Sequence, residues 1–345
     1  MTMPHFTSAQ LEDVGRIVLH QLGTPMAQAE LVSHSLVEAN LLGHDSHGIM
    51  RLITYAQAVH AGQVKPAAQC DLTQTSGATA VVDGAYGWGQ PAAQLASRTA
   101  VNLASQFGVG AVTITRCNHL GRLGEYVDSM ARAGYIGIAM ANVGSSVAPF
   151  GGRTRQLGTN PIAYAVPRGP GQYPVLVDFA TSVQAEGKVH VARDKGQTLK
   201  PGVIIDKDGN PSTEPRAYYD GGALLAFGAH KGYGISVMCE LIGGALSGMA
   251  PSCLPEFGGG NGTLLIALQV SSFVAPDQFA DQTDRFSSTM KAAPTAPGVK
   301  AVLMPGDPEW TARRSHLEHG IDLPERTWND ILQLAQELNL VLPSL

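Results

Sequence analysis

The chain has 345 residues, of which 44% are hydrophobic, so it is long and apolar enough to bury a sizeable core and is not a disordered chain. Charged residues make up only 15%, against about 25% in a typical soluble domain, which predicts that part of the surface is buried between subunits. Lys and Arg number 23, Asp and Glu number 28, and no basic run occurs, so we expect no nucleic acid partner.

The cysteines and the apolar segments indicate a cytoplasmic protein. Cys70, Cys117, Cys239 and Cys253 lie far apart without a CxxC pair, which is typical of reduced thiols and argues against a disulfide framework or a zinc ribbon. The N-terminal residues contain no signal-peptide core. The longest stretch of low charge, residues 232–251, is rich in glycine and interrupted by a glutamate, so we expect a buried helix there and no membrane span.

The first seventy residues carry helical patterns. Apolar residues recur at helical spacing over residues 8–22, 27–42 and 46–62, with Ser8 as the expected N-cap of the first segment. Gly43 ends the second segment. The sequence therefore predicts three helices in this region.

From about residue 71 the pattern changes to short β-rich segments separated by turns. The predicted strands cover residues 79–82, 111–115, 136–140, 162–166, 175–179 and 263–270. The helical stretches between them cover residues 90–107, 124–133 and 232–247. Because strands and helices do not alternate regularly, the pattern predicts the α+β class with a mixed sheet rather than a doubly wound sheet.

The C-terminal residues are again charged and helical, over residues 309–320 and 325–340. We expect these helices to pack on the N-terminal ones. This predicts a discontinuous helical domain of residues 1–70 plus 300–345 and a central mixed α+β domain of residues 71–299. No GxGxxG follows a strand and no GxxxxGK[ST] occurs, so a bound nucleotide would need a non-Rossmann architecture.

Residues 43–51 hold the densest cluster of reactive side chains, which includes His44, Ser46, His47 and Arg51. If a helix begins near Ser46, His47 and Arg51 lie one turn apart beside free N–H groups, which is a good receptor for a carboxylate. The imidazole beside it can move a proton near neutral pH. The alternative is a capped helix with a surface arginine and a hydrogen-bonded histidine. No third metal ligand lies nearby in the sequence, so we expect no metal.

A second cluster, residues 117–124, follows a predicted strand, and loops at strand ends commonly carry functional sites. His119 is close to Gly121, and glycine permits a close approach of a ligand, although a structural histidine is the more common case. Cys117 is a nucleophile by residue type, but nothing in the sequence activates its thiol, so we expect a buried thiol.

Two further clusters suggest contact with a flat ring or a phosphate. Residues 149–152 and 157–161 are rich in glycine and proline, and the backbone of such turns can lie against either group. Lys231 stands at the start of an apolar helix, where a positive charge is unfavourable unless an anion binds there. A solvated lysine explains this residue equally well.

Six segments in one order together resemble a known family. They are HDSHG (44–48), NHLG (118–121), PFGG (149–152), LGTNP (157–161), DFATS (178–182) and HKG (230–232). The chain resembles the malate/L-lactate dehydrogenase-type family of NAD(P)-dependent oxidoreductases, which also contains ureidoglycolate, sulfolactate and diketogulonate dehydrogenases and cyclic ketimine reductases. The segment PGDPE (305–309), followed by Arg313, is similar to the C-terminal pattern of that family.

The resemblance implies a mixed-sheet, non-Rossmann fold in which helices from both termini pack together, and a homodimer. It implies a nicotinamide dinucleotide, NAD or NADP, as cofactor, and no metal. The implied reaction interconverts a small 2-hydroxy acid and a 2-oxo acid, malate-like or lactate-like, by hydride transfer. Reduction of a cyclic imine carboxylate is the alternative, and a non-catalytic binding protein with the same fold is a third interpretation.

The resemblance also implies roles for individual residues. His119 is the first candidate for the acid/base that moves the proton, and His47 with Ser46 is the alternative or its partner. Arg51 and His47 are expected to bind the substrate carboxylate, and Arg122 is either a contact to a distal substrate group or a surface charge. The residues expected to hold the cofactor are His44, Gly121, Thr159, Asn160, Pro161, Asp178, Phe179, Ala180, Lys231, Gly232, Gly306, Asp307, Glu309 and Arg313.

Overall fold

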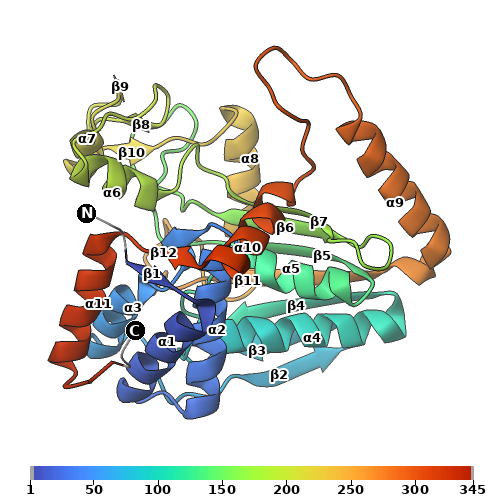
Figure 1. Ribbon diagram of the computed structural model, residues 1–345, viewed down its shortest axis with the longest axis horizontal. Helices are drawn as coiled ribbons and strands as arrows, with labels where there is room; N and C mark the ends of the chain where they lie inside the picture. Colours follow the sequence, from blue (N-terminus) through green and yellow to red (C-terminus); the bar gives the residue numbers. More distant parts are fainter. Residues whose placement is uncertain (1–3, 343–345) are drawn as a thin grey trace.

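A seven-stranded sheet forms the centre of the computed structural model, which describes residues 4–342 (Figure 1). The strand order is β2–β3–β4–β11–β5–β6–β7; β3 and β4 are parallel and the other neighbours are antiparallel. The strands are β2 (Asp71–Ser76), β3 (Thr79–Asp83), β4 (Val109–Thr115), β5 (Tyr135–Ala141), β6 (Pro161–Val166), β7 (Val175–Ala180) and β11 (Thr263–Gln269). The predicted α+β class with a mixed, non-Rossmann sheet is confirmed.

Helices α4 (Gly89–Phe107) and α5 (Leu123–Arg132) cover one face of this sheet (Figure 1). Helix α4 turns a row of fully buried alanines toward the strands, at positions 92, 93, 96, 100 and 104. Such small side chains let the helix backbone lie close to the sheet. Gly110 of β4 is the matching feature, since a Cβ there would collide with the carbonyl oxygen of Ala100.

The first and last segments of the chain share a second core. Strand β1 (His5–Phe6) pairs with β12 (Ile321–Asp322), and one apolar cluster joins residues from both ends of the chain. The helices of this region are α1 (Ser8–Gln21), α2 (Met26–Leu41), α3 (Arg51–His60), α10 (Asp307–His319) and α11 (Glu325–Glu337). The division into residues 1–70 plus 300–345 and residues 71–299 stays a prediction, and residues 1–3 and 343–345 lie outside the described residues.

A smaller lobe lies above the sheet in Figure 1 and has its own apolar cluster. It contains a three-stranded sheet in the order β10–β8–β9. Its elements are α6 (Glu186–Asp194), β8 (Ile204–Ile205), β9 (Pro211–Ser212), α7 (Pro215–Tyr219) and β10 (Ala223–Leu224). Helix α8 (His230–Met238) follows and continues as the π-helical segment η2 (Cys239–Ala245), which packs on β5 and β11. No helix within residues 4–342 is both long and apolar enough to cross a bilayer.

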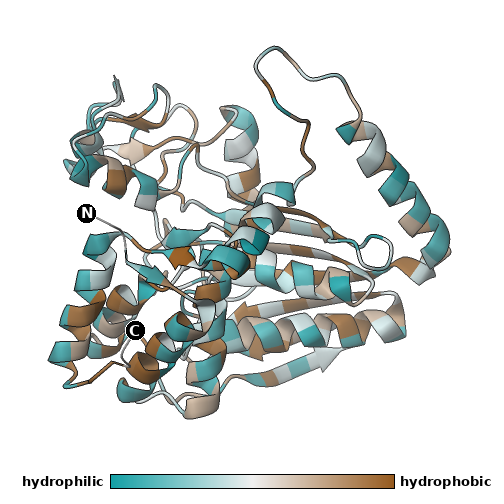
Figure 2. Cartoon of the chain, in the orientation of Figure 1, coloured by the Kyte–Doolittle hydropathy of each residue, from teal (hydrophilic) through white to brown (hydrophobic). Residues whose placement is uncertain are grey.

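Helix α9 (Pro276–Lys291) and the connection after it project from the rest of the molecule (Figure 1). A short 3₁₀ turn, η3 (Val270–Ser272), joins β11 to this region. Only Ser287 of α9 is buried, and the helix is largely hydrophilic in Figure 2. The sequence does not predict this helix, and α9 buries almost none of its surface against the rest of the described chain.

Two predicted helix starts differ from the structure. The N-cap of α1 is Thr7, whose hydroxyl accepts from the backbone N–H of Gln10, so the expected Ser8 cap is off by one residue. The helix predicted from residue 46 is interrupted: a 3₁₀ turn, η1 (Asp45–His47), is followed by an extended Gly48, and α3 begins at Arg51. The expectation that the free N–H groups of a helix start lie beside His47 is therefore wrong.

We expect Gly110→Ala to lower the free energy of unfolding by about 1–3 kcal/mol, because the added methyl group forces α4 away from β4. Urea unfolding at neutral pH measures the change. Gly258→Ala is the control, since a Cβ at Gly258 meets no atom within 4 Å, and it should stay within about 0.5 kcal/mol of the wild type. Equal stability of the two variants would contradict the tight packing of α4 on β4.

Candidate functional site

Two histidine rings from distant segments lie against one another at the centre of the candidate site. His47 ends the 3₁₀ turn η1, and His119 lies in the loop between β4 and α5. Their ring centroids are 5.6 Å apart and the ring planes are inclined by 22°. The hydroxyl of Ser46 lies 3.1 Å from Nδ1 of His47. The structure thus brings together the three residues expected to serve in acid/base chemistry.

Sequence reasoning does not identify the tyrosine that completes this group. Tyr55 of α3 is 5% exposed, and its hydroxyl lies 2.8 Å from Nδ1 of His119. Gln90, fully buried on α4, donates from Nε2 to the same hydroxyl at 2.7 Å. Tyr55 lies four residues after Arg51, and this spacing along a predicted helix is the signal that indicates a shared face.

Both histidines are held in the neutral form. Burial is the main cause that lowers the pKa of His47 to about 3, and the positive charge of Arg51 adds to it. Burial and the same arginine also lower the pKa of His119 well below its ordinary value. A negatively charged ligand beside Arg51 would offset the effect of the arginine and make both rings easier to protonate.

Arg51 opens α3 and turns back toward the histidines. Its Nε donates to the backbone oxygen of Ser46 at 2.6 Å. This bond orients the guanidinium, and its two Nη groups donate to no partner within residues 4–342. A guanidinium with such available N–H groups is suited to bind a carboxylate through two parallel hydrogen bonds.

A second group of ionisable side chains meets at the start of α5. Arg122, the N-cap of α5, is 7% exposed, and its Nη1 lies 4.0 Å from Oδ2 of Asp178. The same carboxylate oxygen accepts from the backbone N–H of Gly124 at 2.7 Å. His44 and Glu309 lie 3.7 Å apart (Nε2 to Oε1), and their charges act on the pKa of Asp178, which burial raises. The interpretation of Arg122 as a surface charge is therefore wrong.

Several polar atoms of this group are buried without a partner. Nε2 of His44, Nε of Arg122 and Oε2 of Glu309 make no hydrogen bond within the part of the chain that the structure describes. Buried polar atoms in folded proteins are nearly always paired. Donors and acceptors in this state, gathered from three separate segments, are typical of a ligand site.

The side chain of Asn160 is fully used within the protein. It is 0% exposed, and its Nδ2 donates to Oε1 of Glu240 at 2.9 Å and to the backbone oxygen of Ser236 at 3.1 Å. Its Oδ1 accepts from the backbone N–H of Val143 at 3.1 Å. The backbone of Asn160 has φ of +37°, and this network holds it in the turn before β6. The backbone of the turn, and not the side-chain amide of Asn160, is left to contact a ligand.

The segment that begins α10 is held by contacts of its own. Arg313 donates from Nε to Glu38 of α2 at 2.6 Å. Asp307 accepts from Nζ of Lys291 at 2.9 Å. Gly306 has φ of +95° and lies beside Trp310, where a larger residue would be strained. These contacts fix the position of α10 and so of its first-turn residue Glu309, while the side chains of Arg313 and Asp307 are engaged in ion pairs.

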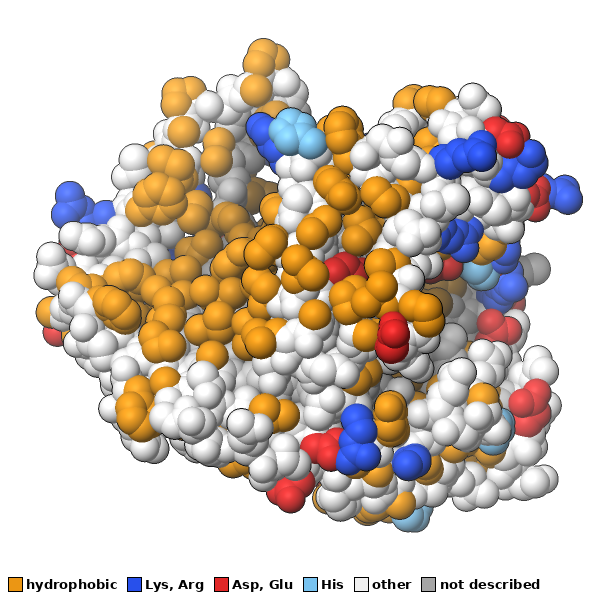
Figure 3. Space-filling view, turned by 180° about the vertical axis from the view of Figure 1, so that it is seen from behind, with side chains coloured by type: hydrophobic (Ala, Val, Ile, Leu, Met, Phe, Trp, Pro, Cys, Tyr) orange, Lys and Arg blue, Asp and Glu red, His pale blue; other side chains and the backbone are white. Residues whose placement is uncertain are grey.

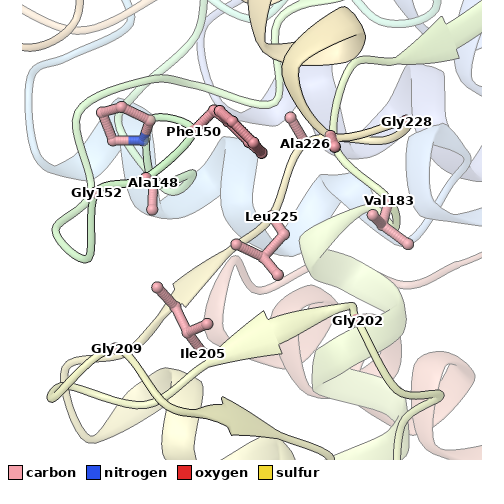
Figure 4. A pocket seen from close by; sticks show the side chains of 13 residues that line it. Ala148, Phe150, Gly152, Val183, Gly202, Ile205, Gly209, Leu225, Ala226 and Gly228 are labelled. Atoms are coloured by element: carbon pink, nitrogen blue, oxygen red, sulfur yellow. The ribbon is translucent and has the colours of Figure 1, made fainter.

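An apolar pocket of about 380 Å³ lies between the PFGG turn and the start of α8 (Figure 4). Figure 4 shows the ring of Phe150 on one side, Leu225 and Ile205 on another, and Val183 across the opening. Phe150 is 60% exposed and approaches the ring of His230 edge-on, with centroids 6.0 Å apart. The pocket offers a flat aromatic ring and apolar walls.

The DFATS segment connects the two regions. Asp178 belongs to the ionisable group at α5, Ala180 pairs with Pro161 at the edge of the sheet, and Val183 lines the apolar pocket. Phe179 contacts Phe227, with ring centroids 5.4 Å apart, in the loop that precedes α8. The other residues expected to hold the cofactor lie near these two regions. Gly121 lies next to Gln90, and the backbone oxygen of Thr159 accepts from the N–H of residue 181. Lys231 and Gly232 lie in the first turn of α8.

Cys117 takes no part in this chemistry. It is 1% exposed, and burial raises the pKa of its thiol to about 12. A thiol of this kind is a poor nucleophile, in agreement with the expected buried cysteine.

Comparison with known proteins identifies the family. A model of the malate/L-lactate dehydrogenase family matches residues 6–332. Hydroxycarboxylate dehydrogenase B of Escherichia coli K12 is 35% identical over 344 residues, covering 97% of this chain and 94% of the relative. Malate/(S)-sulfolactate dehydrogenase of Methanothermus fervidus is 33% identical over 331 residues, covering 94% and 95%. The structure of delta1-piperideine-2-carboxylate reductase from Pseudomonas syringae has a TM-score of 0.86 at 31% identity, covering 96% and 100%.

The chain belongs to the malate/L-lactate dehydrogenase family, which confirms the resemblance of the six motifs. It is an oxidoreductase of the hydroxy-acid dehydrogenase type, and this family implies a nicotinamide cofactor. The residues present fit such a group: unpaired buried donors and an acceptor lie at one end of the DFATS segment, and an apolar pocket with an aromatic ring lies at the other.

We expect His47→Gln to make the protein less sensitive to acid. A free histidine has a pKa near 6.5 and folded His47 a pKa of about 3, so between these values the unfolded chain binds a proton that the folded chain does not. His47 therefore costs no stability above pH 6.5, and as the pH falls below that value it costs up to about 1.4 kcal/mol per pH unit. Between about pH 7.5 and pH 5, the free energy of unfolding measured with urea should fall by about 2 kcal/mol less in the variant than in the wild type.

His60→Gln is the matched control, because His60 lies exposed at the end of α3, the helix that follows the turn of His47. This control should lose as much stability in acid as the wild type does. If His47→Gln lost the same amount too, folded His47 would not be held neutral.

Proposed function

We propose that the chain interconverts a small 2-hydroxy acid and the corresponding 2-oxo acid with a nicotinamide dinucleotide. The observation that carries the proposal is the pair of neutral, stacked histidines beside the available guanidinium of Arg51. Such a reaction needs a group that binds the carboxylate and a group that moves one proton at the neighbouring oxygen. The family relatives act on hydroxy acids by name, which supports the same substrate class here.

Arg51 binds the substrate carboxylate in this proposal. The negative charge of that carboxylate offsets the arginine charge that lowers the pKa of both histidines, so substrate binding prepares a ring to hold the proton. His119 is the proposed acid/base at the substrate oxygen, because Tyr55 orients its ring. His47, with Ser46 on its Nδ1, is its partner and the alternative acid/base.

The cofactor is proposed to lie along the path from the start of α5 to the apolar pocket. The residues that would hold it are His44, Asp178, Glu309, the backbone of 159–161, the first turn of α8 and the PFGG turn. When bound, a nicotinamide dinucleotide supplies or accepts the hydride. The residue types do not favour NAD over NADP.

Arg122 is proposed to favour a substrate with a second negative group. Its charge lies beside His47 and is only partly matched by Asp178 at 4.0 Å. The named substrates of the Methanothermus relative, malate and sulfolactate, each carry two negative groups. We therefore expect oxaloacetate or sulfopyruvate to be used in preference to pyruvate.

A second candidate is the reduction of a cyclic imine carboxylate, because the fold matches that of a piperideine-carboxylate reductase over nearly the whole chain. The deciding experiment offers NADH and NADPH, each with pyruvate, 2-oxobutyrate, oxaloacetate, sulfopyruvate, diketogulonate and two cyclic imine carboxylates, and follows reduced cofactor by absorbance. Turnover of an oxo acid supports the dehydrogenase. Turnover of an imine alone overturns it in favour of the reductase.

A homodimer in the cytoplasm is also proposed. Figure 3 shows a wide area of hydrophobic side chains on the back of the molecule. Apolar side chains exposed in the single chain include Met238, Leu241, Leu246, Phe273 and Phe286. Contiguous apolar areas of this kind are typical of subunit interfaces, and the four unpaired cysteines fit a reducing compartment. Light scattering coupled to size exclusion should give twice the mass of the chain, and the mass of one chain would contradict the dimer.

We expect Arg51→Lys to raise the KM for the 2-oxo acid about 10- to 100-fold, because a lysine cannot reproduce two parallel hydrogen bonds to a carboxylate. Steady-state kinetics on the best substrate of the screen measures the change. Arg98→Lys, an exposed arginine of α4, is the control and should leave KM unchanged. Equal KM values in the wild type and Arg51→Lys would show that the carboxylate binds elsewhere.

A further inference from the structure

A chain of three hydrogen-bonded side chains leads from helix α4 to the ring of His119. Nε2 of Gln90 donates to the hydroxyl oxygen of Tyr55 at 2.7 Å, and that hydroxyl lies 2.8 Å from Nδ1 of His119. The other ring nitrogen of His119, Nε2, has no hydrogen bond within residues 4–342. The three groups therefore leave one nitrogen of the ring for a ligand.

The direction of the hydrogen bonds follows from the donors. An amide N–H can only donate, so the oxygen of Tyr55 accepts from Gln90 and its own O–H is left to point at His119. Burial raises the pKa of Tyr55 to about 12, so the hydroxyl keeps its proton at any working pH. A ring nitrogen that accepts from this O–H carries no proton, and the neutral ring then carries its proton on the other nitrogen.

We propose that Tyr55, held by Gln90, is a positioning residue that fixes His119 as the tautomer with its proton on Nε2. The ring then presents an N–H, not a lone pair, to the substrate oxygen. A neutral imidazole that donates in this way polarises a carbonyl group and makes its carbon a better hydride acceptor. Because this tautomer has no lone pair toward the substrate, it assigns to His119 the polarisation of the substrate oxygen and leaves the proton to His47, the alternative acid/base stacked on it. This effect on catalysis rests on the proposed function, whereas the tautomer itself does not.

The surroundings hold both side chains in place. The ring of Tyr55 packs on Trp88 with centroids 5.2 Å apart, and Trp88 donates to Thr24 at 2.9 Å. The backbone of the His119 loop is equally restricted, since a Cβ at Gly89 would lie 2.6 Å from the carbonyl oxygen of His119. A ring held at both its backbone and its Nδ1 has little freedom to rotate, so Nδ1 stays opposite the hydroxyl of Tyr55.

The same loop is tied down by Asn118. Its Nδ2 donates to the backbone oxygens of Gln63, Tyr86 and Gly87 at 2.9–3.2 Å.

The charged or titratable groups that act on the Tyr55–His119 pair are Arg51, His47, Glu125 and Cys117.

Nitrogen-15 NMR of protein labelled in histidine tests the proposal directly, because protonated and unprotonated ring nitrogens differ widely in chemical shift. His119→Gln assigns the signals of His119. In the wild type near neutral pH we expect an unprotonated Nδ1 and a protonated Nε2. In Tyr55→Phe we expect a mixture of both tautomers, and a kcat about 10- to 100-fold lower with KM within about twofold.

Tyr126→Phe is the matched control. Tyr126 is also buried, and its hydroxyl donates to the backbone oxygen of Leu120 in the same loop, but it makes no hydrogen bond to His119. This variant loses the same atom and should keep the tautomer of the wild type.

A wild-type ring with its proton on Nδ1, or an unchanged tautomer in Tyr55→Phe, would overturn the proposal. The wild-type spectrum decides this even if Tyr55→Phe does not fold. Failure of the wild type to turn over any oxo acid or imine would contradict the proposed function and leave the tautomer test unaffected.

Discussion

The side chain of Asn40 determines where the reactive part of this molecule lies. Its Oδ1 accepts from the backbone N–H of Ile49 at 2.8 Å and its Nδ2 donates to Asp45 at 2.8 Å, so one amide spans the turn that contains His47. Glycine is the only residue type that fits at position 48, because any Cβ there would collide with the side chain of Asn40. The clamped turn separates His47 from α3, and in this turn the ring of His47 stacks on that of His119.

Charge is distributed unevenly around the two histidines, and this sets their chemistry. Burial disfavours a second proton on either ring, and the positive charge of Arg51 adds to this effect at both rings, while that of Arg122 adds to it at His47. Asp178 balances Arg122 from 4.0 Å, whereas Arg51 has no carboxylate partner within residues 4–342. The unmatched charge is the one proposed to receive the substrate, so an anionic substrate completes the electrostatics of the site.

The sequence predicts the sheet and most helices because their signals are local. The segment predicted at 111–115 is β4, that at 263–270 is β11, and the missing Rossmann fingerprint correctly indicates another architecture. The break before α3 was not predictable from periodicity, since it depends on Asn40, which belongs to another helix. Local patterns do not show the Tyr55–Gln90 pair or the Asn160–Glu240 bond, because each joins residues 35 or more positions apart. The burial of Arg122 is hidden for a similar reason, since several separate elements pack around it.

The same geometry bears on which of the two proposed reactions suits the site. A 2-oxo acid brings a neutral carbonyl whose oxygen becomes negative as hydride arrives, and positive arginines with a neutral N–H donor stabilise that change. A cyclic imine is reduced most readily as its cation, and a cationic nitrogen is repelled by Arg51 and Arg122 while neither neutral histidine offers it a countercharge. The relative that reduces such imines shares the fold, so the distinction must come from side chains near the rings rather than from the architecture. The balance of charge around the rings therefore supports the proposed oxo-acid reaction, and supports it more for a substrate with a second anionic group.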